Sequence, residues 1–163
     1  MSVAPARPVE RRPLLAGAIW RMRAIVKPPV TLGVRALVIA PGGEVLLVRH
    51  TYMPGFHLPG GAVDPGESAR EAMRREVREE SGLSIDDAGD LFHLYWNRRL
   101  AGRDHVALFV VRLAGAVVAP RFSSAEIAES GFHAPGSLPA DTTESTRRRR
   151  AEVLSGEPIS DVW

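Results

Sequence analysis

Short apolar runs, interrupted by glycine and proline, make up most of the chain from residue 30 onwards. Val30 to Ala40 is rich in β-branched residues, residues 41–43 (Pro-Gly-Gly) have turn chemistry, and Val45 to Val48 is apolar again. This pattern predicts a β-hairpin. Leu91 to Trp96 and Val106 to Leu113 are two further strand candidates.

Two segments carry helical signals. Ser68 and Glu71 have the spacing of a capping box, strong helix formers follow, and Gly82 suits the position after a helix C-terminus. We therefore expect a helix from Ser68 to Ser81. The segment from Thr143 to Leu154 predicts a final helix.

The segments between these elements are irregular. Residues 52–66 contain three prolines and four glycines, so they form a loop for most of their length. Long loops in small domains are usually functional. We expect a short connector from Ala125 to Glu129. The four consecutive arginines at 147–150 predict a solvated face of the last helix rather than a phosphate clamp.

The length of 163 residues fits one domain and an N-terminal arm. Residues 1–29 carry a proline-rich arm and, from Leu14 to Lys27, a candidate amphipathic helix that packs on the domain or on a dimer partner. Residues 30–163 form the main domain. The stretch from Pro13 to Val26 contains two arginines and is shorter than the roughly 20 residues of a membrane span, so we expect a cytoplasmic protein without a membrane partner.

Composition narrows the chemistry further. The chain has no cysteine, which excludes disulfides and thiolate ligands and leaves oxygen or imidazole donors, typical of hard cations. Basic residues number 21 against 19 acidic ones, and Lys27 is the only lysine. Arginine forks suit phosphate-bearing partners. No basic stripe interleaved with aromatic residues is present, so we do not expect nucleic acid as the main partner.

The helix from Ser68 to Ser81 directs acidic side chains towards the protein interior. At about 100° per residue, Glu76 and Glu80 fall within its apolar arc and Glu79 lies beside it. These like charges repel one another and lie at the negative end of the helix dipole. Protonation, pairing with arginine, or a bound divalent cation could each compensate.

A recognisable motif contains these acids. Residues 61–83 consist of Gly, five residues, Glu, seven residues, Arg-Glu-Val, Arg, Glu-Glu, Ser and Gly-Leu. This segment resembles the Nudix box at every fixed position, and the resemblance extends over about residues 30–155. It implies an α/β/α sandwich with a central mixed sheet. It also implies a hydrolase that cleaves the phosphoanhydride bond of a nucleoside diphosphate linked to another group.

The resemblance implies a metal site and a set of catalytic residues. Glu76, Glu79 and Glu80 would bind Mg²⁺ or Mn²⁺, with the carbonyl of Gly60 as an added ligand. The remaining roles go to neighbours in the motif and to a later loop: Arg75 orients a catalytic glutamate, Glu67 supports the loop before the helix, and Glu76 or Glu126 acts as the general base.

The candidate substrate contacts are side chains on the strands and loops near the box. Arg35, Arg49, Tyr52 and His57 are the candidates. Tyr52 could stack on a base and Arg49 could contact phosphate, although packing alone also explains an aromatic residue in a proline-rich loop.

The family resemblance leaves the substrate open. No proline occurs from Gly66 to Ala119, whereas ADP-ribose pyrophosphatases typically carry one some way after the box. Nucleotide sugars, ADP-ribose-like compounds and nucleoside triphosphates therefore all stay candidates. Two alternatives are a nucleotide-sensing Nudix domain without turnover and an RNA 5′-pyrophosphohydrolase. Homodimers are common in the family, so a second copy is a candidate partner.

Overall fold

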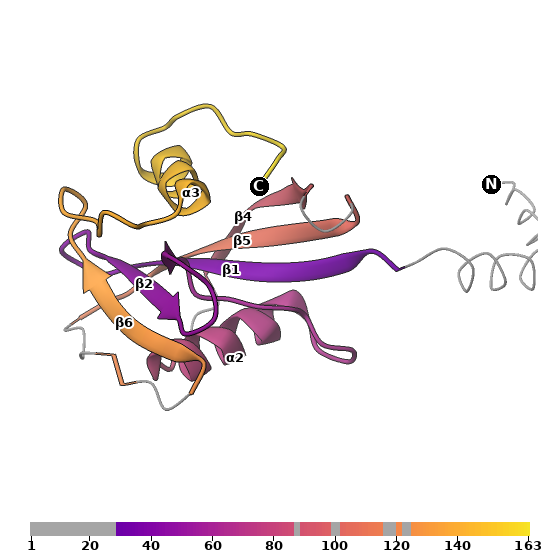
Figure 1. The fold of residues 1–163 in the computed structure, drawn as a ribbon, viewed down its shortest axis with the longest axis horizontal. Coiled ribbons are helices and arrows are strands. Elements are labelled where there is room, and N and C mark those ends of the chain that lie inside the picture. The colour runs from indigo at the N-terminus through magenta and orange to yellow at the C-terminus, as the bar shows by residue number, and fades with distance from the viewer. Residues whose placement is uncertain (1–28, 87–88, 99–101, 116–119, 122–124) are drawn as a thin grey trace, which may run out of the picture. The chain divides into compact units, whose positions relative to one another are not determined.

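The computed structural model describes residues 29–86, 89–98, 102–115, 120–121 and 125–163. Residues 31–163 form one compact unit. In this unit, a six-stranded sheet lies between two helices, labelled α2 and α3, one on each face (Figure 1). The helix expected from Leu14 to Lys27 lies outside the described residues. Within the described ranges, no helix is both long and apolar enough to span a bilayer.

The sheet is mixed, as expected. Its strand order is β3-β2-β1-β5-β4, and β6 pairs with β2. β1 and β5 are parallel, whereas the other pairs are antiparallel. The elements are β1 (Thr31–Ile39), β2 (Val45–His50), β3 (Phe56–His57), α2 (Ala69–Ser81), β4 (Asp90–Asn97), β5 (Asp104–Arg112), β6 (Ile127–His133) and α3 (Glu144–Leu154).

The predicted hairpin is confirmed, but it is not the main pairing of its first strand. β1 meets β2 at Ile39 and Val45, whereas it pairs with β5 along its whole length, from Thr31 opposite Asp104 to Ile39 opposite Arg112. Parallel central strands are covered on both faces and therefore carry continuous apolar runs. The apolar run from Ala36 to Ile39 in β1 has this physical origin.

Helix α2 is bounded as its sequence predicts. The Ser68 hydroxyl accepts a hydrogen bond from the Glu71 N–H at 3.3 Å, and the Glu71 carboxylate accepts one from the Ser68 N–H at 2.7 Å. Gly82 ends the helix in the left-handed region at φ 73°. The apolar face of α2, including Met73 and Val77, is fully buried against the sheet. That packing fixes which way the acidic residues of α2 point.

The expected connector from Ala125 to Glu129 is wrong for most of its length. Strand β6 begins at Ile127 and runs antiparallel to β2. Only Ile127 of this strand is fully buried, so the sequence has no strong alternation to reveal it. Backbone pairing with β2 makes this segment a strand.

The arginine block agrees with the expected solvated face at Arg147 and Arg148, which are exposed, but not at Arg149. Arg149 is 0% exposed, and its guanidinium bonds the Glu152 carboxylate at 2.6 Å and the Val162 carbonyl at 2.9 Å. The Tyr95 hydroxyl donates to the same carboxylate at 2.7 Å. Arg147 donates to the carbonyl of Pro139 at 2.7 Å. These two arginines fasten α3 to β4 and to the flanking segments.

Arg149→Ala should therefore lower the free energy of unfolding by about 3 kcal/mol or more, because it leaves the buried Glu152 without its cation. Urea denaturation followed by circular dichroism measures this change. Arg148→Ala is the matched control, because Arg148 is exposed on the same helix, and its effect should stay within about 0.5 kcal/mol. Equal effects of the two substitutions would contradict the structural role of Arg149.

Candidate metal and diphosphate site

The loop before α2 lies along the part of β1 that β2 leaves unpaired. The Gly61 carbonyl accepts from the Val34 N–H at 2.8 Å, and the Pro59 carbonyl accepts from the Ala36 N–H at 2.9 Å. Gly60 has φ 143°, and a Cβ there would overlap the Val34 carbonyl oxygen. Only glycine allows the loop backbone to approach β1 and α2 so closely.

Glu80 reaches this loop from the last turn of α2. It is 7% exposed, and its Oε2 accepts a hydrogen bond from the Gly60 N–H at 2.9 Å. Burial raises the pKa of Glu80 to about 7, and the nearby charges of Glu76 and Glu126 act in the same direction. The Gly60 N–H and the Arg35 cation oppose this rise in pKa. The protonated and the ionised forms of this carboxyl are therefore close in free energy near pH 7.

Arg75 forms ion pairs with other acidic side chains of the box. Its guanidinium donates to Glu67 at 2.8 Å and to Glu76 at 2.8 Å, and it lies 3.4 Å from Glu79. Glu67 also accepts from the Asp64 N–H at 2.8 Å, so it joins the loop to the helix. These bonds lower the pKa of Glu67 and raise that of Arg75, whereas burial raises the pKa of Glu76.

The three predicted metal-binding glutamates differ in exposure. The side chain of Glu76 is 14% exposed, that of Glu80 9%, and that of Glu79 49%. A Cβ at Gly61 would overlap the Glu76 carboxylate, so glycine leaves space for that group. Within the described ranges, no three acidic or histidine side chains already surround one point. Glu76 and Glu79 are instead tied to Arg75.

His50, at the end of β2, is a site residue that the sequence did not reveal. Its side chain is 4% exposed, and its Nε2 lies 3.4 Å from Oε1 of Glu80. Burial lowers the pKa of His50 to about 4, and the charges of Arg35 and His57 add to this effect. The ring is therefore neutral at pH 7. Nothing in the local pattern distinguishes His50 from a surface polar residue at a strand end.

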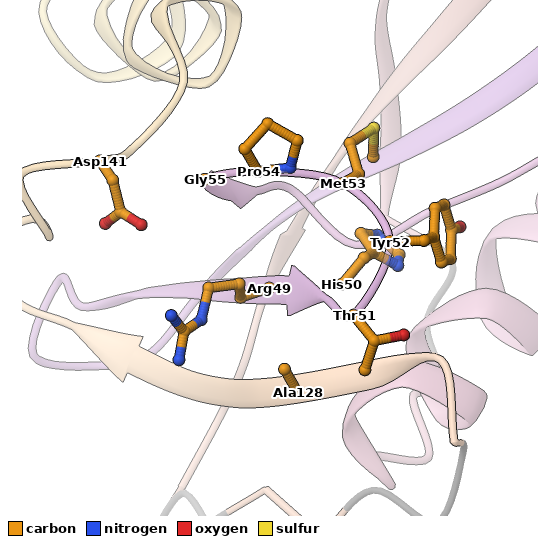
Figure 2. A pocket seen from close by; sticks show the side chains of 9 residues that line it. All are labelled: Arg49, His50, Thr51, Tyr52, Met53, Pro54, Gly55, Ala128 and Asp141. Carbon is orange, nitrogen blue, oxygen red and sulfur yellow. The ribbon is translucent and has the colours of Figure 1, made fainter.

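The four predicted substrate residues do not all lie together: Arg49 and Tyr52 line one pocket, and Arg35 lines another. Tyr52 is 68% exposed, and its ring lies 5.2 Å from that of His50. Figure 2 shows these two side chains together, while Arg49 points away along β6, where it pairs with Glu129 at 2.9 Å. His57 is bound to the Pro54 carbonyl at 2.9 Å. Residues 49–55, with Ala128 and Asp141, line a pocket of about 660 Å³.

Arg35 lies in another part of the site. Its guanidinium donates to the Leu58 carbonyl at 2.8 Å, and burial lowers its pKa. It lines a second pocket, of about 380 Å³, together with Gly61, Asn97 and Trp163. Arg35 thus adds positive charge behind the Glu76 and Glu80 carboxylates.

Glu126 precedes β6 and is exposed. Its backbone carbonyl accepts from the Thr51 N–H at 2.8 Å. Its charge is close enough to contribute to the raised pKa values of Tyr52 and Glu80, both of which are raised chiefly by burial. The structure thus brings the side chain of Glu126 into the electrostatic range of the box.

Comparison with known proteins identifies the family of this chain. The sequence profile of the NUDIX domain matches residues 29–153. A Bacillus subtilis (strain 168) protein provisionally named 8-oxo-dGTP diphosphatase is 30% identical over 126 residues, which cover 77% of this chain and 81% of that protein. An RNA pyrophosphohydrolase from Escherichia coli O139:H28 (strain E24377A / ETEC) is 44% identical over 45 residues, but these are only 28% of this chain and 26% of that protein.

Solved structures agree with the sequence match. The MutT NUDIX hydrolase of Burkholderia pseudomallei superposes with a TM-score of 0.63 at 26% identity, covering 78% of this chain and 100% of that chain. The NUDIX domain of Shewanella oneidensis NrtR, solved with ADP ribose, gives a TM-score of 0.69 at 16% identity over 86% of this chain and 98% of that chain. At this low identity, the similarity to the NrtR domain shows the fold alone.

The chain belongs to the NUDIX domain family. With Nudix hydrolases among its relatives in both sequence and structure, it is an enzyme of the pyrophosphohydrolase type. Nudix hydrolases generally use divalent metals. The predicted family and the α/β fold are thus confirmed.

The raised pKa of Glu80 predicts a pH-dependent stability in the metal-free protein. Protonated Glu80 favours the folded state, so its contribution is present below the ordinary glutamate pKa of about 4.5 and is lost as the pH rises through about 7. With chelator, Glu80→Gln should therefore match the wild type near pH 4.5. It should be more stable by on the order of 3 kcal/mol at pH 8.

Urea denaturation across this pH range measures the difference. Glu79→Gln is the matched control, because Glu79 is on the same turn with a half-exposed side chain, and its effect should be small at every pH. A difference between Glu80→Gln and wild type that does not change with pH would contradict the inferred burial of charge at Glu80.

Proposed function

We propose that this protein hydrolyses the phosphoanhydride bond of a nucleoside diphosphate linked to another group, using Mg²⁺ or Mn²⁺. The observation that carries the proposal is the buried carboxyl of Glu80 against the Gly60 N–H, with Glu76 on the preceding turn of α2. Carboxylate and carbonyl oxygens are the ligands that such cations prefer. In this proposal Glu76, Glu79, Glu80 and the Gly60 carbonyl hold the cation.

The donor set fits a divalent cation. Glu80 has no cationic partner within 4 Å among the described side chains, since its nearby histidine is neutral. Glu76 lies against Gly61, where a β-carbon would collide with it. When bound, the cation would neutralise the diphosphate oxygens and activate the attacking water.

The protein's own residues then have separate roles. Arg75 donates to Glu76 at 2.8 Å, which would hold that carboxylate in one orientation. Glu76 or Glu126 would accept the proton of the attacking water. Arg35 would add positive charge near the diphosphate, and Arg49 would have to exchange Glu129 for a phosphate in order to contribute. Tyr52 and His57 would line the substrate side of the loop.

Nucleoside triphosphates are the substrates to test first. The relative that matches most of this chain at 30% identity is named for an oxidised nucleoside triphosphate. Solved structures named as an ADP-ribose pyrophosphatase and a UDP-X diphosphatase share the fold at 22% and 19% identity, which is too distant to choose a substrate. Because of these two structures, nucleotide sugars and ADP-ribose stay among the substrates to be tested.

A second candidate function is ligand binding without turnover. The similar fold of the NrtR NUDIX domain, solved with ADP ribose, gives this alternative a specific ligand. The complete box, with Arg75 and Glu76 in contact, favours catalysis. The RNA 5′-pyrophosphohydrolase alternative has less support, because its match covers only 28% of this chain.

Hydrolysis should therefore be observed with one or more members of a panel containing 8-oxo-dGTP, unmodified nucleoside triphosphates, ADP-ribose, UDP-sugars and 5′-triphosphorylated RNA. Triphosphate substrates would release phosphate or pyrophosphate, whereas ADP-ribose and UDP-sugars would yield a nucleoside monophosphate and a sugar phosphate. Activity should require Mg²⁺ or Mn²⁺ and disappear with chelator, because the acids cannot neutralise a diphosphate. Glu80→Gln should lower kcat at least about 100-fold. Tight ligand binding without release of product would favour the ligand-binding alternative, and near wild-type turnover by Glu80→Gln would remove Glu80 from the metal site.

Tyr52→Ala should raise KM about tenfold with a smaller change in kcat, because stacking of an aromatic side chain on a base contributes about 1–3 kcal/mol. Steady-state kinetics on the best substrate of the panel measures this effect. Leu94→Ala is the control, because Leu94 is 49% exposed and lies on β4. An unchanged KM in Tyr52→Ala would show that Tyr52 does not contact the substrate.

A further inference from the structure

We propose that His50 is a direct ligand of the divalent cation, through Nε2 and beside Glu80, so that this site combines nitrogen with oxygen donors and favours Mn²⁺ over Mg²⁺. The inference rests on the proposed function in one respect: the carboxylates of α2 hold a cation. It goes further in adding a residue outside the box and in choosing the class of metal.

The first observation is that the His50 ring is buried without a partner. Its side chain is 4% exposed, and neither ring nitrogen has a hydrogen-bond partner among the described residues. A buried polar atom left unpaired costs about 1–3 kcal/mol. A cation bound to Nε2 would satisfy one of these atoms.

The second observation is the position of the ring relative to Glu80. Nε2 lies 3.4 Å from Oε1, yet the two atoms make no hydrogen bond. Adjacent donors on one octahedral cation, each about 2.1–2.2 Å from it, are separated by about 3.0 Å. The two atoms are therefore within a few tenths of an ångström of the separation that a shared cation requires.

Oε2 of Glu80 is not available to His50, because it already has a hydrogen-bond partner. Oε2 is bound to the Gly60 N–H at 2.9 Å, so the backbone fixes the carboxylate and leaves Oε1 facing His50. His57 is the other histidine nearby, with its ring 5.9 Å from that of His50, but its Nε2 is bound to the Pro54 carbonyl. His50 is therefore the imidazole that the geometry selects.

The charges around the ring allow a cation. Arg35 and, when it is protonated, His57 are the positive groups whose fields reach His50. The carboxylates of Glu80 and Glu76 act on the same guanidinium and offset its charge. A divalent cation between His50 and Glu80 would thus have the carboxylates of Glu76 and Glu80 to offset the charge of Arg35.

The choice of metal follows from the donor atoms. Mg²⁺ strongly prefers oxygen ligands and dehydrates reluctantly, whereas first-row transition ions, among which Mn²⁺ binds most weakly, also bind sites that contain imidazole nitrogen. His50→Gln should therefore weaken Mn²⁺ binding about tenfold while changing Mg²⁺ binding much less. His133→Gln is the matched control, because His133 also has an unpartnered Nε2 but lies at the far end of β6, opposite Val45.

The decisive experiment is pulsed electron paramagnetic resonance on the full chain loaded with Mn²⁺ alone. Wild-type protein and His133→Gln should show nitrogen coupling to the metal. Growth with ¹⁵N-histidine should shift that coupling to the ¹⁵N frequencies, and His50→Gln should lose it. The labelling arm needs no substitution, so it tests for an imidazole ligand even if His50→Gln fails to fold.

The outcomes separate this inference from the proposed function. Mn²⁺ binding without nitrogen coupling in the wild type would overturn the His50 inference and leave an all-oxygen metal site in place. Coupling that persists in folded His50→Gln would also overturn it, because another histidine would then be the ligand. A wild-type protein that binds neither Mn²⁺ nor Mg²⁺ would overturn both the inference and the metal dependence of the proposed function.

Discussion

The hydrogen bond from the Gly60 N–H to Glu80 is the contact on which the site depends. It joins the loop that lies along β1 to the last turn of α2, and it is possible only because Gly60 adopts φ 143° where a Cβ would collide with Val34. A buried carboxylate needs such donors, since burial without them is costly. The same bond aims the second oxygen of Glu80 at His50.

Charge balance explains the surroundings of this contact. Several acids lie at the C-terminal end of α2, where the helix dipole disfavours negative charge. Arg75 bridges Glu67 and Glu76, and Arg35 contributes a partly buried cation from β1. The charge of Arg35 and the Gly60 N–H do not offset the burial of Glu80, which raises its pKa to about 7. A divalent cation beside this carboxylate would lower the free-energy cost of its negative charge.

The opposite face of the sheet has a different polar network with a structural role. Arg149 and Glu152 of α3 are buried with Tyr95 of β4, and the same guanidinium holds the Val162 carbonyl. This network fixes the segment carrying Trp163, which lines the pocket beside Arg35 and Gly61. Buried ionic groups of this kind define how elements dock, even where their net contribution to stability is modest.

The sequence by itself determined the bounds of α2 and the inward direction of two acids of the box. Capping residues bound α2 at Ser68 and Gly82, and helical periodicity turned Glu76 and Glu80 inward, because these signals act within a few residues of one another. Tertiary structure decided the parallel pairing of β1 with β5, the strand β6, the burial of Arg149 and the approach of His50 to Glu80. Each of these joins segments far apart in the chain, and local propensity carries no information about which distant segment will cover a given side chain.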